Sequence, residues 1–303
     1  GAASVASGDG STASGVLSEA AGVESLAAGY FASAQGDGAV AVGAESIAAG
    51  TTAASFGFAA EATAGYSTAV GGYANASAFN ATALGSFADA SGSNSVALGG
   101  DAVASGAYST ATGQGSLASG TNSVAVGGAF LGLLPTEASG NYSTALGGGA
   151  WSAGTNSTAL GNASIAQAAN SVALGADSLA DRADSVSVGS AGAERVVTNV
   201  AAGSEGTDAV NLDQLNAVAE VAETTGRYFQ ATGSDDSDAG ALATGANAVA
   251  AGEASNALAD GASAFGSGAT AVASNATAVG FNALAAGQNS AAFGNNAQAT
   301  GPA

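Results

Sequence analysis

Short stretches in which small and larger side chains alternate, each ending at a glycine, recur along the chain at a fixed step. From Gly8 the glycines fall every seven residues as far as Gly127, with an occasional alanine in the place of glycine. The step resumes at Gly140, and a third stretch in the same phase begins at Gly245. Self-similarity at a short fixed period predicts a solenoid of stacked coils.

Alternate heptads differ in sequence, so the full repeat is fourteen residues long. The sharper type reads Asn-Ser-Val-Ala-Leu/Val-Gly, at residues 94–99, 122–127 and 170–175. Its alternation with a period of two predicts a short β-strand, and the glycine suits a corner with positive φ. Each repeat is therefore expected to form two strands and two turns, and the chain an all-β solenoid of the β-roll kind.

The sharper strand has a large apolar face and a small-residue face. Because the interior of a two-strand coil is thin, we expect large residues from this strand to pack inside against alanines such as Ala118 from the companion strand. The predicted roll core is Val96, Leu98, Val124, Val126, Val172 and Leu174.

The small-residue face would then lie outside. It holds only Ala or Ser in every coil from Gly43 to Gly189, and a flat, uncharged face of this length favours packing against another sheet. The alternative is a low-complexity surface produced by repeat duplication. The predicted self-association interface is Ser95, Ala97, Ser123, Ala125, Ser171 and Ala173.

The outer face of the companion strand mixes charged and apolar residues, which indicates exposure to solvent. Glu61 and Asp89 share it with Leu117, Trp151 and Ile165. We expect ligand contacts at these last three residues, although scattered apolar residues are common on protein surfaces.

An insertion interrupts the array between Gly127 and Gly140. It contains the most hydrophobic stretch of the chain, which includes Phe130 and Leu131. One hypothesis is an exposed binding loop, in which these two residues join the ligand contacts. The other, which we favour, is a loop packed against the roll or a neighbouring chain.

The strand pattern stops after Gly189 and gives way to helical spacing. Apolar residues at Leu212, Leu215, Val218 or Ala219, and Ala222 approach a heptad seam, with Asp208 or Asn211 as the N-cap. A helix of about four turns is marginal alone in water, whereas three such helices in a coiled coil are stable. The fourteen-residue pattern then returns.

Composition restricts the function. The 303 residues include no Cys and no His, three Arg, no Lys and 23 acidic residues, for a net charge of −20. The missing residue types argue against an enzyme, a metal site or a cofactor site, and the charge argues against binding nucleic acid. No apolar run is long enough for a transmembrane helix. A monomeric ice-binding β-solenoid remains an alternative, although its regular threonine arrays are absent.

Two motifs together resemble the trimeric autotransporter adhesins. The Asn-Ser-Val-Ala-Leu/Val-Gly units are similar to the head repeat of that family. The segments 194–203 and 208–215 resemble its neck motif. The resemblance implies neck roles for residues that match this motif, namely Arg195, Thr198, Asn199, Asp208, Asn211 and Leu215.

The resemblance also implies the architecture and the assembly. It implies a left-handed parallel β-roll, against the usual right-handed rule for parallel crossovers, assembled as a homotrimer. The expected division is a head at 1–189, a neck at 190–211, a short coiled-coil stalk at 212–226 and a partial second head at 227–303.

The function implied by the resemblance is attachment by a bacterial surface adhesin. Its expected ligands are collagen, fibronectin, laminin or host cell surfaces, and it is expected to act in autoaggregation and biofilm. The membrane anchor that tethers the family to the outer membrane is absent from this sequence, so we expect an excised passenger segment.

Overall fold

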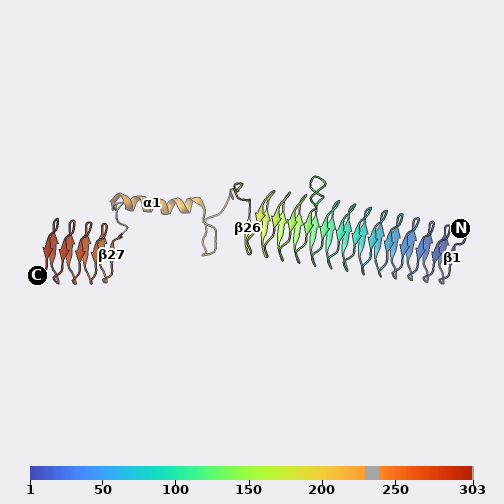
Figure 1. Cartoon of the computed structure of the whole chain (residues 1–303), viewed down its shortest axis with the longest axis horizontal. Coiled ribbons are helices and arrows are strands. Elements are labelled where there is room, and N and C mark those ends of the chain that lie inside the picture. Colours follow the sequence, from blue (N-terminus) through green and yellow to red (C-terminus); the bar gives the residue numbers. More distant parts are fainter. Residues whose placement is uncertain (229–238, 302–303) are drawn as a thin grey trace. The chain divides into compact units, whose positions relative to one another are not determined.

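The structure is a computed structural model that describes residues 1–228 and 239–301. Residues 229–238 and 302–303, which the sequence assigns to the second head, lie outside the described residues. The chain divides into two units, Gly1–Val196 and Val197–Ala303, and each is described by itself (Figure 1).

The first unit is a roll of two parallel sheets with thirteen strands each, through which the chain passes alternately (Figure 1). The odd sheet contains β1 Val5–Ala6, β3 Glu19–Ala20, β5 Ser33–Ala34, β7 Ile47–Ala48, β9 Glu61–Ala62, β11 Asn75–Ala76, β13 Asp89–Ala90, β15 Val103–Ala104, β17 Leu117–Ala118, β19 Glu137–Ala138, β21 Trp151–Ser152, β23 Ile165–Ala166 and β25 Leu179–Ala180. The even sheet contains β2 Thr12–Ser14, β4 Leu26–Ala28, β6 Val40–Val42, β8 Ala54–Phe56, β10 Thr68–Val70, β12 Thr82–Leu84, β14 Val96–Leu98, β16 Thr110–Thr112, β18 Val124–Val126, β20 Thr144–Leu146, β22 Thr158–Leu160, β24 Val172–Leu174 and β26 Val186–Ser187.

Strand register confirms the fourteen-residue coil. Val96 of β14 pairs with Thr82 on one side and with Thr110 on the other. The register shifts only where the insertion lies, since Leu117 pairs with Glu137. Parallel pairing in both sheets confirms the predicted solenoid, whereas its left hand stays a prediction.

The second unit contains one helix and a smaller roll of the same kind. Helix α1 spans Leu212–Tyr228. The roll has a five-stranded and a four-stranded parallel sheet. Its strands are β27 Leu242–Ala243, β28 Val249–Ala251, β29 Asn256–Ala257, β30 Ser263–Phe265, β31 Thr270–Ala271, β32 Thr277–Val279, β33 Leu284–Ala285, β34 Ala291–Phe293 and β35 Gln298–Ala299.

Glycine recurs at both corners of the coils, for two different reasons. At corner A, which joins an even strand to the next odd strand, Gly99 has a φ of 135°, as the sequence predicts. At corner B, which joins an odd strand to the next even strand, the φ of Gly106 is not positive. There a Cβ would lie 2.1 Å from the Gly120 carbonyl oxygen of the next coil, so close stacking of backbones leaves little room for a side chain at Gly106.

The interior of the first roll is filled by small side chains, and this overturns the predicted core. Among the described residues, every buried apolar residue is alanine, and the buried polar residues are serines and Thr136. The residues assigned to the self-association interface are all fully buried inside the roll: Ser95, Ala97, Ser123, Ala125, Ser171 and Ala173. They are therefore core residues and have no surface to offer another chain.

The residues assigned to the core point outward instead. Val96 and Leu98 are 37% and 41% exposed, and the same positions of the other coils, Val124, Val126, Val172 and Leu174, are at least partly exposed. The physical reason is the narrow gap between the two sheets, which leaves room for alanine and serine from both strands and for nothing larger. Ala118 does lie inside, as expected.

Candidate functional site

The outer face of the even sheet is uncharged along all thirteen of its strands and carries apolar side chains on most of them. Its outward residues are Val, Leu, Thr, Ala, Ser and Phe, and no strand of this sheet contains an acidic or basic residue. We call the outward side chains of the even-numbered strands, from β2 to β26, the apolar face. Five of its leucines, Leu84, Leu98, Leu146, Leu160 and Leu174, are exposed in the single chain, so this surface lacks a partner there.

The outer face of the odd sheet differs from the apolar face in charge. Glu19, Glu61, Asp89 and Glu137 all point outward from it. An acidic, part-exposed sheet face suits contact with water, as the sequence predicts for the companion strand.

The predicted ligand contacts of the odd sheet lie on three of four consecutive strands, β17, β21 and β23. Register aligns Leu117 with Glu137, Glu137 with Trp151, and Trp151 with Ile165. We call Leu117, Trp151 and Ile165 the Trp151 column; Glu137 interrupts it, and Ser139 Oγ accepts a hydrogen bond from the indole Nε1–H of Trp151 at 3.4 Å. The structure therefore brings together three of the five predicted contacts.

The insertion, residues 128–136, leads directly into β19 of the odd sheet. We call these residues the apolar knob. Phe130 packs over Gly149, where a Cβ would meet the Phe130 Cβ at 2.7 Å. Leu131 and Leu133 are 79% and 82% exposed. The hypothesis that the loop packs against its own roll is therefore wrong for the leucines at its tip, and contact with a neighbouring chain or an external ligand remains.

Thr136 anchors this knob, and the sequence analysis did not identify it. Its side chain is fully buried, and its Oγ1 lies 2.8 Å from the Gly147 carbonyl oxygen and 3.1 Å from that of Gly128. The same oxygen accepts a hydrogen bond from the Gly149 N–H at 3.2 Å. Its position directly before an odd strand matches that of Ser116 before β17, and this was the available signal.

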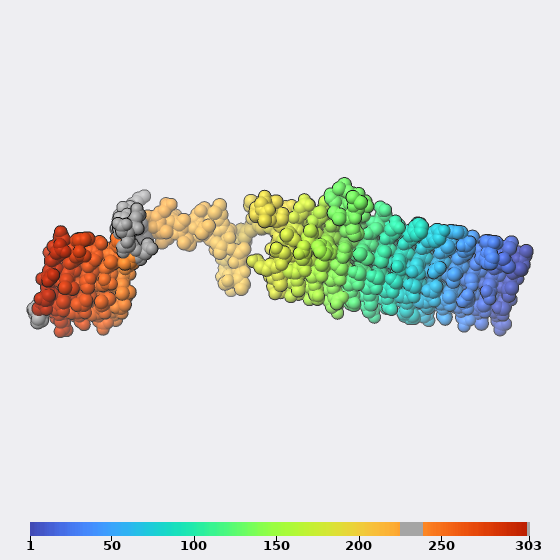
Figure 2. Space-filling view, in the orientation of Figure 1, coloured from blue at the N-terminus to red at the C-terminus, as the bar shows by residue number. Residues whose placement is uncertain are grey.

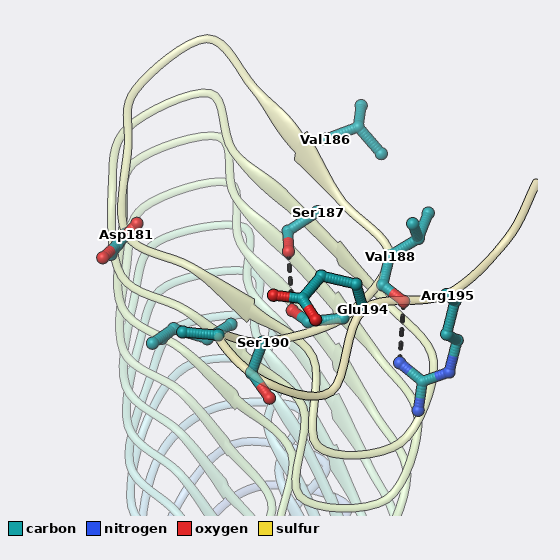
Figure 3. A pocket seen from close by; sticks show the side chains of 10 residues that line it. Asp181, Val186, Ser187, Val188, Ser190, Glu194 and Arg195 are labelled. Atoms are coloured by element: carbon teal, nitrogen blue, oxygen red, sulfur yellow. Dashed lines mark hydrogen bonds between the residues drawn. The ribbon is translucent and has the colours of Figure 1, made fainter.

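The first roll ends in an open pocket of about 490 Å³, lined by β25, β26 and the first neck residues (Figure 3). Arg195 donates hydrogen bonds to the Val188 carbonyl oxygen at 2.7 Å and to Ser178 Oγ at 2.9 Å, and also to the Ala176 carbonyl oxygen. Asp181 lies across the pocket from it (Figure 3). Arg195 thus closes the last coil by binding carbonyl groups to which no further coil can donate.

The rest of the neck is tied to the start of α1. Asn211 Oδ1 accepts a hydrogen bond from the Gln214 N–H at 3.1 Å, and Gln214 Oε1 accepts one from the Asn211 N–H at 3.3 Å. This reciprocal pair is a capping box and identifies Asn211 as the N-cap. The Gln214 side chain also makes two hydrogen bonds with the backbone of Gly203: Oε1 accepts one from the Gly203 N–H, and Nε2 donates one to the Gly203 carbonyl oxygen. One side chain therefore joins the neck to the helix.

Asp208, the other N-cap candidate, orders the turn before the helix. Its Oδ2 accepts hydrogen bonds from the backbone N–H groups of Ser204 and Glu205, both at 2.9 Å. These bonds favour the charged carboxylate and lower the pKa of Asp208 below its ordinary value. Of the other expected neck residues, Thr198 and Asn199 are exposed and make a single hydrogen bond to each other.

The apolar seam of α1 faces solvent in the single chain. Leu212, Leu215, Val218 and Val221 are all exposed. Val221 continues the seam at a position where the sequence analysis named Ala222. Within the described residues no helix has the length and apolar character to cross a membrane, and no group of acidic side chains is placed to hold a metal ion.

Comparison with known families explains this arrangement. The YadA head domain repeat (2 copies) matches residues 20–46, 76–102, 104–129, 138–164 and 165–191, and again 243–269, 260–283, 271–297 and 285–302. The coiled stalk of trimeric autotransporter adhesin matches residues 196–238. The head matches alone cover more than half of the sequence. The chain belongs to the trimeric autotransporter adhesins.

Comparisons with individual proteins add less. The crystal structure of the collagen-binding domain of Yersinia adhesin YadA matches with 27% sequence identity and a TM-score of 0.31, and the match covers 69% of this chain and 87% of that one. Among curated proteins no match is found. Membership in the adhesin family therefore rests on the head and stalk matches, which coincide with the stacked coils and with the neck and α1.

Proposed function

We propose that three copies of this chain assemble through the apolar face into an adhesive rod that attaches bacteria to host surfaces. The observation that carries the proposal is the contrast between the two outer faces of the first roll (Figure 2 shows the roll in space-filling form). One is uncharged over thirteen strands and mostly apolar, whereas the other carries carboxylates. A large unpartnered apolar surface marks an interaction site, and the acidic face suits the outside of an assembly.

The exposed seam of α1 supports the same assembly. Seventeen residues of helix are marginal alone, and a helix of this length gains its stability from packing of an apolar face. Leu212, Leu215 and Val218 recur every three residues along one side of α1. In a coiled coil of three copies these residues are removed from water together with the apolar face of the roll.

Adhesion is assigned to the Trp151 column and the apolar knob, which carry exposed apolar groups outside the apolar face. Repeated weak contacts on a trimer give avidity that one copy lacks. The ligands implied by the family resemblance are collagen, fibronectin and laminin or host cells, and the same contacts between rods account for autoaggregation and biofilm. The full-length protein would be tethered to the outer membrane of the bacterium.

The experiment that tests this proposal measures molar mass and matrix binding on the same protein. Light scattering on a sizing column is expected to give three times 27.6 kDa, independent of concentration. Binding of this species to immobilised collagen, fibronectin and laminin is then compared between the wild type, Trp151→Ala with Leu131→Ala, and the control Ile47→Ala from the same sheet face.

Each proposed part has its own outcome. We expect the Trp151 and Leu131 double variant to lose binding at unchanged molar mass, while Ile47→Ala binds as the wild type does. A monomer at all concentrations would overturn the assembly. If the double variant remains a trimer and binds the matrix proteins as tightly as the wild type does, the assigned adhesive surface is wrong.

A further inference from the structure

Aromatic side chains gather at corner A in the N-terminal part of the first roll. Tyr30, Phe31, Phe58, Tyr73 and Phe87 all lie there and are all exposed. Outside the insertion, the later corner A positions, from residue 100 to residue 177, carry no aromatic side chain. The cluster is therefore confined to one stretch of one edge of the roll.

Three of these rings form a continuous column along the roll. Phe58 and Tyr73 meet edge to face with centroids 5.3 Å apart, and Tyr73 stacks on Phe87 at 5.0 Å with an interplanar angle of 5°. The rings come from three consecutive coils. We call Phe58, Tyr73 and Phe87 the ring column, and among the described ring contacts it ends at Phe87.

The backbone at this corner does not favour aromatic residues. Tyr73 and Phe87 have φ values of 59° and 57°, in the left-handed region that suits Gly, Asn and Asp and in which a bulky side chain is an outlier. Corresponding corners later in the roll place Asp101 and Gly115 at this position with similar φ. Backbone conformation therefore does not explain why aromatic residues occur in consecutive coils at this corner, where their rings stack.

Carboxylates lie at both ends of the ring column. Glu45 occupies the same corner one coil before Phe58, and Asp101 occupies it one coil after Phe87, as the pairing of Val42 with Phe56 and of Leu84 with Leu98 requires. Both are exposed. The sequence contains no Lys, and its first Arg is Arg182, so no basic side chain of the first twelve coils competes for these rings and carboxylates.

We propose that the ring column, with Glu45 and Asp101, binds a cationic segment of a partner protein. Arginine and lysine side chains bind to the faces of aromatic rings and pair with carboxylates. A net charge of −20 attracts such a segment from a distance. This inference deepens the proposed adhesive function by naming the chemistry of one partner, and it uses neither the Trp151 column nor the apolar knob.

The test uses the full chain and a fluorescein-labelled nona-arginine peptide, with nona-glutamine as the uncharged probe. In the ring variant, Tyr73→Asn with Phe87→Asn, the net charge is unchanged and both left-handed positions receive a residue that suits them. We therefore expect an undiminished melting temperature and affinity for nona-arginine reduced about tenfold or more, since removing a single cation–π interaction at an exposed site weakens binding severalfold.

A matched control separates the ring column from general attraction to an acidic protein. Tyr108 and Tyr142 are exposed tyrosines with φ of 58° at corner B, and Tyr108→Asn with Tyr142→Asn is expected to bind nona-arginine as the wild type does. Glu45→Gln with Asp101→Asn is expected to weaken binding and its dependence on salt. Matrix binding through the Trp151 column is expected to be unchanged in all three variants, so failure of either proposal can be recognised separately.

Three results would overturn the proposal. The first is a wild type that does not bind nona-arginine in preference to nona-glutamine. The second is a ring variant that binds as tightly as the wild type or as its corner B control. The third is a changed molar mass of the ring variant, which would place the ring column between copies of this chain.

Discussion

Ala97 and Leu98 are consecutive residues of β14 that point to opposite sides of the first roll. Ala97 is fully buried between the two sheets, whereas Leu98 is 41% exposed on the apolar face. Substitutions at Ala97 therefore test the folding of one roll, whereas substitutions at Leu98 test the association of several rolls.

Arginine substitution at each position is expected to have different effects. Leu98→Arg should leave the β-sheet spectrum intact and shift the molar mass from trimer toward monomer, because it removes about 1.5–3 kcal/mol of apolar burial per copy and brings like charges together. Ala97→Arg should prevent folding of the neighbouring coils, since an unpaired charge inside the roll costs several kcal/mol. Light scattering and circular dichroism measure the two effects, and loss of roll structure in Leu98→Arg at constant mass would contradict the assignment of faces.

Glycine substitutions test the close stacking at corner B. In Gly106→Ala the new methyl group would lie 2.1 Å from a backbone oxygen of the next coil, and overpacking of this kind costs about 1–3 kcal/mol or more. The melting temperature of the roll should fall. Gly72→Ala is the control, because the nearest atom to its Cβ is 3.9 Å away; equal destabilisation by both substitutions would refute the stacking argument.

Periodicity alone was sufficient to predict the coil and the helix, although it left the N-cap open between Asp208 and Asn211. A glycine every seven residues fixes the length of a coil regardless of what fills it, and apolar residues at helical spacing from Leu212 onward indicate the helix. Neither prediction depends on how far apart the two sheets lie.

Which side chains face the interior of the roll depends on the distance between the two sheets, and this prediction from the sequence was wrong. Alternation in Ser95 to Leu98 separates two faces but does not say which is inside. The informative signal was constancy of size: an interior of fixed width accepts only Ala or Ser in every coil, whereas the outer positions vary from Thr to Leu. Thr136 was missed because the insertion breaks the step of the repeat and so hides the equivalence of Thr136 with Ser116.

The capping box predicts the contribution of the neck to stability. Asn211→Ala removes the cap of α1 and is expected to cost about 0.5–2 kcal/mol, while Asn211→Asp retains an acceptor and should cost much less. Gln214→Ala should cost more than loss of the cap alone, because Gln214 also holds both backbone groups of Gly203. Helicity and chemical denaturation of the full chain measure these effects, and equal stability of all three variants would show that assembly alone sets the helix start.

Acidification is expected to loosen the turn before α1. Hydrogen bonds from the N–H groups of Ser204 and Glu205 lower the pKa of Asp208 in the folded state. A lowered pKa contributes stability that is fully present above the ordinary value of about 3.9 and is lost as the pH falls through the lower folded value. The side-chain carboxyl signal of Asp208, followed by NMR, should therefore titrate below its ordinary value in the folded chain. Asp208→Asn keeps a neutral acceptor, so its Ser204 and Glu205 amide signals should not move with this titration; a wild-type midpoint at the ordinary value would show that the two hydrogen bonds do not form in solution.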